Sequence, residues 1–182
     1  MAETSACTPQ EAFERLGSPL VRKRRKSSGG RGLEMIYRQQ DLVLRQDGRN
    51  ILERYVSAPE ASIESFISGG QIQFINTTRY LEKGHVNFVP SGLDEVLLES
   101  MRGLNRRVIE ALKINWGITH LEVYLVDGGL LFGEIALRPP GGYIMNAMQH
   151  AYAFNPWEAM VAIELGEDFD FPDSPVACCG VE

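Results

Sequence analysis

The sequence has little of several features that would each assign it to a specialised class of protein. Its 182 residues include three cysteines, Cys7, Cys178 and Cys179, which are too few and too unevenly placed for a disulfide framework. We therefore expect a reducing compartment, and hence a cytoplasmic protein. No stretch approaches the roughly 18 consecutive apolar residues that a membrane span needs. Residues 1–10 also lack the charged-then-apolar pattern of a secretory signal.

Positive charge is missing from one end of the chain. No Lys or Arg occurs from residue 139 to residue 182, and the whole chain has a net charge of -6. This acidity argues against general affinity for nucleic acid. With 44% hydrophobic residues, the sequence is too apolar for a mainly disordered chain and can bury a core without disulfides. Composition thus predicts an ordinary globular protein of one or two domains.

A run of five basic residues at 22–26 stands apart from this acidity. Three interpretations are open: a solvated loop, a nucleic-acid patch, or a site for an anion. The run follows a short apolar segment at 19–21, and a Gly- and Ser-rich stretch at 27–32 leads on to an alternating segment at 33–37. Such a turn between two strands lets backbone N–H groups and a lysine approach phosphate. The pattern therefore indicates a phosphate cradle between two strands. It differs from the Gly-rich nucleotide loops that lead directly into a helix.

Periodicity and turn residues predict the remaining scaffold. Short helices are expected at 11–16 and 39–45, strands at 51–56, 62–67 and 71–77, and a long helix at 93–112. Gly69 and Gly70 predict a hairpin between the last two of these strands. Ser91 is the expected cap of the long helix, with Asp94 three residues later. We assign this helix to core packing, because its apolar residues recur at steps of three and four.

Residues 118–138 form the most informative segment, because two alternating runs flank a turn at 127–129. An antiparallel hairpin with a three-residue loop centred on Gly128 places the apolar residues of both strands on one face. This register sets Glu122 directly across from Glu134. The expected core face carries Leu121, Val123, Leu125, Leu131, Ile135 and Leu137. The expected opposite face carries His120, Glu122, Tyr124, Phe132, Glu134 and Arg138.

Two directly opposed carboxylates repel each other across a Cβ separation of about 4.5–5.5 Å, and three explanations are open. A shared cation is the first, since two carboxylates suit Mg²⁺ with water and phosphate oxygens as its other ligands. A carboxylate dyad with one raised pKa is the second. The third is a solvated face on which the side chains splay apart, with Arg138 beside one of them. The phosphate cradle elsewhere in the chain favours the metal.

Four segments, in order along the chain, together resemble the ATP-grasp superfamily across about residues 9–166. The first is similar to the family's lid, where a lysine and a Gly-rich loop hold the triphosphate. The second resembles the hinge strand that binds adenine and ribose, and the third and fourth resemble the two metal-binding strands. The segments read LGSPLVRK at 16–23 with SGGRG at 28–32, LERYVSAPE at 52–60, HLE at 120–122, and EIALRPPGG at 134–142.

The resemblance implies roles for individual residues. The implied nucleotide-binding residues are Lys23, Ser28, Gly29, Gly30, Glu53, Tyr55, Val56, Glu60 and His120. Glu122 and Glu134 would bind Mg²⁺ or Mn²⁺, and Arg138 would act with Lys23 on the transferred phosphoryl group. Ala136 stands where many members have a metal-binding Asn, which leaves a second ion open.

The implied fold is α+β in two lobes, with ATP between them. A small β/α lid would cover residues 1–56, and a larger antiparallel sheet with packed helices would cover 57–166, followed by a polar tail at 167–182. The implied activity is ATP-dependent ligation, in which a carboxylate is activated as an acyl phosphate and attacked by an amine, with an amino acid or similar substrate.

Two other hypotheses stay open. One is a non-catalytic or truncated nucleotide-binding module that needs a partner chain. Family members usually carry an N-terminal α/β domain ahead of the lid, so we expect such a domain, or a second copy in a homodimer, as the protein partner. The other is a nucleic-acid binder that uses the basic run, which the acidic balance disfavours. No membrane partner is expected.

Overall fold

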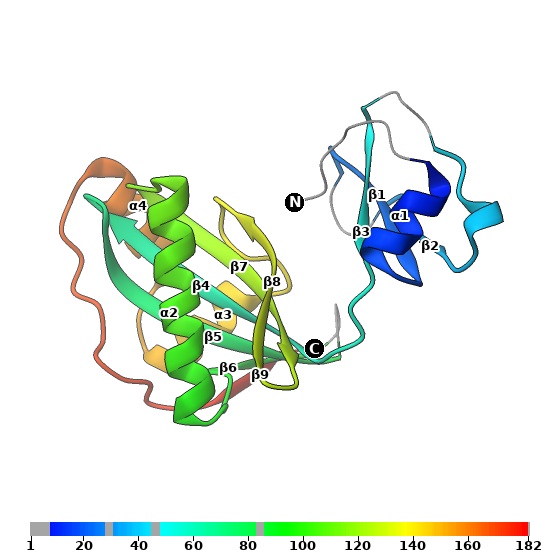
Figure 1. Cartoon of the computed structure of the whole chain (residues 1–182). Coiled ribbons are helices and arrows are strands. Elements are labelled where there is room, and N and C mark those ends of the chain that lie inside the picture. The colour runs from blue at the N-terminus through cyan, green and yellow to red at the C-terminus, as the bar shows by residue number, and fades with distance from the viewer. Residues whose placement is uncertain (1–7, 28–30, 45–47, 83–85, 182) are drawn as a thin grey trace. The chain divides into compact units, whose positions relative to one another are not determined.

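The computed structural model describes residues 8–27, 31–44, 48–82 and 86–181. The chain divides into two compact units, Met1–Ser57 and Ala58–Glu182 (Figure 1). The regular structure of these described residues consists of antiparallel sheets, four α-helices and one short 3₁₀ helix, as expected for an α+β fold. None of the helices in these ranges is both long enough and apolar enough to span a bilayer.

The first unit is a three-stranded antiparallel sheet with one helix. Its elements are α1 (Pro9–Leu16), β1 (Leu20–Arg24), β2 (Glu34–Ile36), the 3₁₀ helix η1 (Gln39–Asp41) and β3 (Asn50–Arg54), with strand order β2-β1-β3. Thr8 and Glu11 form the capping box that starts α1, and Gly17 ends it. The helix expected at 39–45 is wrong in length: only the single turn η1 forms. Arg38 provides no side-chain cap at its start, Leu42 is extended at its end, and residues 42–44 are not helical. The buried core consists of Ala12, Leu20, Ile36 and Leu42.

The second unit is a six-stranded antiparallel sheet with helices on both faces (Figure 1). Its strands are β4 (Glu60–Ser68), β5 (Gln71–Glu82), β6 (Val86–Val89), β7 (Gly117–Val126), β8 (Gly129–Ala136) and β9 (Cys179–Val181), in the spatial order β8-β7-β4-β5-β6-β9. Helix α2 (Glu95–Leu112) covers one face, and α3 (Ile144–Tyr152) with α4 (Pro156–Leu165) covers the other.

Alternation along the strands divides the second unit into two apolar cores. The core under α2 contains Ala61, Ile63, Met101, Leu121 and Val123. The core under α3 and α4 includes Phe66, Phe74, Ile118, Met145, Met148 and Ile163. Because successive residues of a strand point to opposite faces, the polar residues next to Ile63 and Leu121 share the α3 face of the sheet.

The long helix begins later than its expected cap. Asp94 caps α2, since its carboxylate accepts a hydrogen bond from the backbone N–H of Leu97 at 3.0 Å. Ser91, the expected cap, is fully buried, and its hydroxyl lies 2.8 Å from that of Thr77. The polar side chain of Ser91 therefore supports the packing of β5 and does not start the helix.

Residues 167–181 complete the second unit, although we expected a polar tail from residue 167. Strand β9 pairs antiparallel with β6, with Gly180 opposite Phe88. The ring of Phe171 has its centroid 5.3 Å from those of both Phe66 and Phe74. The acidic residues of this segment alternate with aromatic ones, so its polar composition concealed rings that close the core.

Candidate functional site

The carboxylate pair predicted for the hairpin is in place, because Glu122 lies directly opposite Glu134 in the β7–β8 register. The predicted register also holds at Leu121 and His120, but it is wrong nearer the turn. There Val126 pairs with Gly129, so the loop has two residues where three were expected. A β-bulge next to Glu122 adds one residue to β8 and restores the predicted pairing.

Gly133 makes this bulge possible. A Cβ atom added to Gly133 would lie 2.9 Å from the backbone oxygen of Glu122, closer than side chains tolerate. A glycine is therefore required beside the backbone of one of the two carboxylate residues.

The bulge also changes which leucines of β8 face the core. Leu130 packs into the core under α2, whereas Leu131, expected there, lies opposite Tyr124 and is 43% exposed. Phe132 lies opposite Val123 and so belongs to the α2 face, not to the carboxylate face. Leu137, also expected in the core, is exposed.

Two rows of side chains cross the α3 face of the sheet at right angles to the strands. Strand register places Thr78, Ser62, Glu122 and Glu134 in one row, and Asn76, Glu64, His120 and Ala136 in the other. Ser62, Glu64, Asn76 and Thr78 are fully buried. The carboxylate pair is thus the open end of an ordered polar layer.

Glu64 is the centre of this layer. Its carboxylate accepts hydrogen bonds from Ser62 Oγ at 2.6 Å, from Asn76 Nδ2 at 2.6 Å and from Thr78 Oγ1 at 2.9 Å. His120 Nδ1 lies 2.9 Å from Glu64 Oε1. A buried carboxylate is costly unless donors surround it, and these four partners meet that requirement.

His120 links Glu64 to the carboxylate pair. Its Nε2 lies 3.4 Å from Glu122 Oε1 and 3.3 Å from the hydroxyl of Tyr80. Burial opposes a charge on the ring, but hydrogen bonds with Glu122 and Glu64 outweigh it and raise the pKa of His120 to about 9. Burial, reinforced by Glu64 and Glu122, raises the pKa of Tyr80, which keeps its proton at neutral pH. A cationic ring therefore lies beside Glu122.

Stability is expected to fall as the pH rises from about 6.5 to about 9. The pKa of His120 is about 9 in the folded chain and 6.5 in the unfolded chain, so the folded state holds the proton more tightly. The contribution of His120 to stability is therefore complete below pH 6.5 and lost above about pH 9. The titratable groups around the ring are Glu64, Glu122 and Tyr80. Urea unfolding across this range with EDTA present would measure the slope. His120→Gln should flatten it, and an equal slope in the variant would contradict the assignment.

Arg138 lies in the exposed loop after β8, where its Nη1 donates to the carbonyl of Pro139 at 2.8 Å. Asn87 of β6 ties this loop to the sheet, because its Nδ2 donates to the carbonyl of Gly142 at 2.9 Å. Gly142 has φ +61°, and a Cβ there would lie 2.8 Å from Asn87 Nδ2. The hydrogen bond therefore anchors the Gly142 end of the 139–142 segment to β6.

The predicted lid residues belong to the first unit. Two strands flank the Gly- and Ser-rich turn, as expected, and β1 pairs antiparallel with β2. Strand β1 is longer than expected, so Arg22, Lys23 and Arg24 lie within β1 and not in the turn. Lys23 Nζ lies 2.8 Å from Glu53 Oε2, with the two side chains 28% and 42% exposed. An ion pair this exposed stabilises by about 1 kcal/mol or less, so an incoming anion can compete with Glu53 for the lysine. Tyr55 and Val56 directly follow β3. Ser28, Gly29 and Gly30 lie outside the described residues.

Glu60 and Tyr124 stand opposite each other where β4 begins. Glu60 is the remaining residue that the resemblance assigned to the nucleotide, and it lies on β4 two residues before Ser62. Because alternate residues share a face, Glu60 lies on the same face of the sheet as Glu64 and the carboxylate pair.

The carboxylate pair has the donor set that a hard divalent cation takes. Glu122 and Glu134 offer oxygen ligands from directly opposed positions, and a shared ion would remove their repulsion. Among the residues that the structure describes, no group of three or more His, Cys, Asp or Glu side chains gathers as metal ligands. An ion here would therefore take its other ligands from water or phosphate, as Mg²⁺ commonly does.

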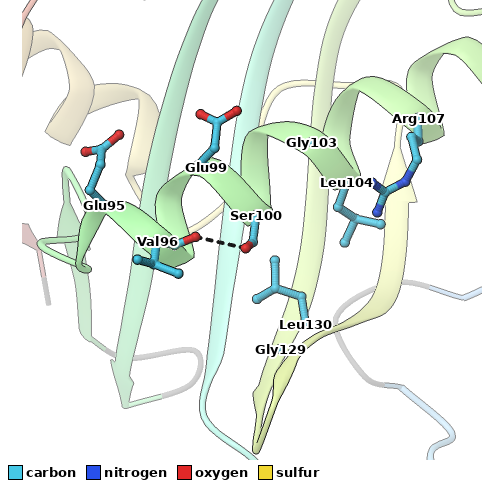
Figure 2. A pocket seen from close by; sticks show the side chains of 9 residues that line it. All are labelled: Glu95, Val96, Glu99, Ser100, Gly103, Leu104, Arg107, Gly129 and Leu130. Atoms are coloured by element: carbon cyan, nitrogen blue, oxygen red, sulfur yellow. Dashed lines mark hydrogen bonds between the residues drawn. The ribbon is translucent and has the colours of Figure 1, made fainter.

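A shallow groove on the opposite face of the sheet has a different character. It runs between α2, from Glu95 to Arg107, and the tip of β8 at Gly129 and Leu130 (Figure 2). Figure 2 shows a hydrogen bond between two of its lining residues, which the Ser100 hydroxyl donates to the carbonyl of Val96 within α2. None of the residues predicted for the site lines this groove.

Sequence reasoning missed the buried part of the site. Glu64, Asn76, Thr78 and Tyr80 lie in strands that were predicted or that extend the predicted ones, yet no role was assigned to them. A signal was present: polar residues fill every second position of 60–64 and 76–80, on a face that the neighbouring phenylalanines identify as partly buried.

The chain is similar to known proteins over most of its length. The ATP-grasp domain family matches residues 1–150 of the chain. The L-arginine-specific L-amino acid ligase of Bacillus subtilis is 28% identical in an alignment of 185 positions that covers 91% of this chain and 45% of the ligase. The chain spans about half the length of the relatives it matches.

Solved structures share the fold at lower identity. N5-carboxyaminoimidazole ribonucleotide synthetase from Thermus thermophilus matches with a TM-score of 0.76 and 22% identity, covering 94% of this chain and 48% of that one. The Staphylococcus aureus N5-carboxyaminoimidazole synthetase, complexed with ADP, gives 0.78 and 19%, covering 99% and 50%. L-amino acid ligase from Bacillus licheniformis gives 0.71 and 21%, covering 91% and 44%. Because the ATP-grasp domain model matches most of the sequence, and these solved structures share its fold, the chain belongs to the ATP-grasp family.

Proposed function

We propose that this chain binds ATP and Mg²⁺ as part of a ligase that activates a carboxylate as an acyl phosphate for attack by an amine. The observation that carries the proposal is the opposed pair Glu122 and Glu134, joined through His120 to a buried polar layer, in a member of the ATP-grasp family. Two of the matched proteins are named as amino acid ligases, and another was solved with ADP, which favours an amino-acid substrate and an adenine nucleotide.

The charged residues suit phosphoryl transfer, in which positioning and electrostatics do most of the work. Glu122 and Glu134 would hold Mg²⁺, which supplies charge neutralisation for phosphate oxygens when bound. Lys23 would exchange its weak pairing with Glu53 for a phosphate oxygen. Arg138 would place its guanidinium beside the transferred group, and the 139–142 loop would lie beside the acceptor.

The nucleoside would use the residues around the end of β3 and the start of β4. We assign adenine contacts to Glu53, Tyr55 and Val56, and the ribose hydroxyls to Glu60. His120 takes a different role from the nucleotide contact we expected. His120 is 5% exposed, and both ring nitrogens already have protein partners. We assign His120 to holding Glu122.

Thermal unfolding with and without ATP and Mg²⁺ tests the proposal. A ligand that binds only the folded chain stabilises it by about 2.7 kcal/mol at one hundred times its Kd, a rise in Tm of roughly 5–10 °C for a chain of this size. Glu134→Gln should lose most of the rise, whereas Glu110→Gln, an exposed change on α2, should keep it. No rise in the unsubstituted chain would sink the proposal.

The ligase half of the proposal needs a second readout. ADP release should increase when an amino acid is added together with ATP and Mg²⁺, and a panel of amino acids would identify the substrate. An ATP-dependent rise in Tm with no amino acid raising ADP release would favour the alternative of a nucleotide-binding module.

A further inference from the structure

We propose that Glu64 is a positioning residue for the cation site, acting through His120 to hold the Glu122 carboxylate opposite Glu134. The inference rests on the proposed function, because it takes Glu122 and Glu134 as the ligands of the ion. Glu64 itself is fully buried and contacts neither the ion nor the nucleotide in this scheme.

The path from Glu64 to Glu122 runs through one rigid ring. Glu64 Oε1 lies 2.9 Å from His120 Nδ1, and His120 Nε2 lies 3.4 Å from Glu122 Oε1. Because an imidazole is planar, a carboxylate that fixes one nitrogen also fixes the direction of the other. In metal sites, partners behind a ligand commonly set its orientation in this way and change metal affinity when they are lost.

Glu122 needs such a partner because of its neighbour across the hairpin. Two opposed carboxylates repel each other, and a glutamate side chain gains rotamer entropy when it swings away. The interaction with His120 holds Glu122 against both effects. An ion then meets ligands that are already in place and loses less binding free energy to ordering them.

Folding stability alone gives a poor account of the buried cluster. Replacing a buried charged pair with well-packed apolar residues is often neutral or stabilising. Here Ser62, Asn76 and Thr78 all direct hydrogen bonds to Glu64, at distances of 2.6–2.9 Å. These three donors fix the carboxylate that in turn fixes His120. The cluster lies in the two rows of side chains that also contain His120 and Glu122, where a fixed orientation has a use.

Mn²⁺ binding to the full chain, followed by the EPR signal of the free ion, tests the inference without relying on activity. Glu64→Gln keeps the size of the side chain and removes its charge, and should weaken Mn²⁺ binding about tenfold. His120→Gln should weaken it equally. The double variant should be no weaker than either single one, because both changes interrupt one path.

Control variants separate the possible failures. Glu122→Gln and Glu134→Gln should each remove most Mn²⁺ binding, and if neither does so, the proposed cation site itself is wrong. If they do, while Glu64→Gln and His120→Gln bind Mn²⁺ as the unsubstituted chain does, the inference alone is overturned. Additive losses in the double variant would also overturn it. If Glu64→Gln fails to fold, normal Mn²⁺ binding by His120→Gln is sufficient to reject the inference.

Discussion

Replacing Phe171 with Ala is expected to lower the Tm by roughly 6–12 °C. The ring stacks on Phe74 at 5.3 Å with an interplanar angle of 11°, and meets the edges of Phe66 and Phe154. Removing an aromatic side chain from a core costs about 3–5 kcal/mol, and the partial exposure of Phe171 points to the lower end. Each kcal/mol corresponds to roughly 2–4 °C at this chain length. Differential scanning calorimetry would measure the shift.

Asp170→Ala is the matched control, because Asp170 is the exposed neighbour of Phe171 in the same segment. An exposed substitution away from special contacts usually changes stability by no more than about 0.5 kcal/mol. If both variants unfolded like the unsubstituted chain, residues 167–181 would behave as the polar tail that composition suggested. A large loss for Phe171 alone would show that the segment closes the core next to the polar rows, on the same face of the sheet, where Phe66 follows Glu64 along β4.

Local signals predicted the parts of this fold that local physics determines. Alternation and turn glycines identified the β4–β5 and β7–β8 hairpins, and helix α1 ends at Leu16, the last residue of the predicted range. The opposition of Glu122 and Glu134 was correct although the loop is one residue shorter than assumed. The reason is that burial of one sheet face requires matching parity in the two strands, and the bulge at Gly133 supplies the missing residue.

Contacts between distant strands were not predictable by the same means. The hydrogen bond between His120 and Glu64 joins residues 56 positions apart, and it depends on β4 pairing with β7. No periodicity within either strand specifies that neighbour. The same reason explains why residues 167–182 were expected to form a tail. The polar composition of this segment is a local property, whereas β6, the partner of β9, is remote in sequence.

Gly133→Ala is expected to destabilise the chain by about 1–3 kcal/mol, the usual cost of forcing extra atoms into a packed site. The added Cβ would meet the backbone oxygen of Glu122 at 2.9 Å and its carbonyl carbon at 3.3 Å. Neither atom belongs to a side chain that can rotate away, so the strands themselves must separate or slip. Urea unfolding would measure the loss.

Gly133→Ala should cost more free energy of ion binding than free energy of unfolding. The bulge at Gly133 is what pairs Glu134 with Glu122, and a slip of one residue would turn Glu134 to the opposite face of the sheet. Gly103→Ala provides the control, because Gly103 lies inside α2 with the nearest atom 3.8 Å from its added Cβ. That change should raise stability by about 1 kcal/mol through helix propensity and leave Mn²⁺ binding unchanged. If Gly133→Ala bound Mn²⁺ as tightly as Gly103→Ala, the two carboxylates would not need their opposed register, and a shared ion would lose its structural basis.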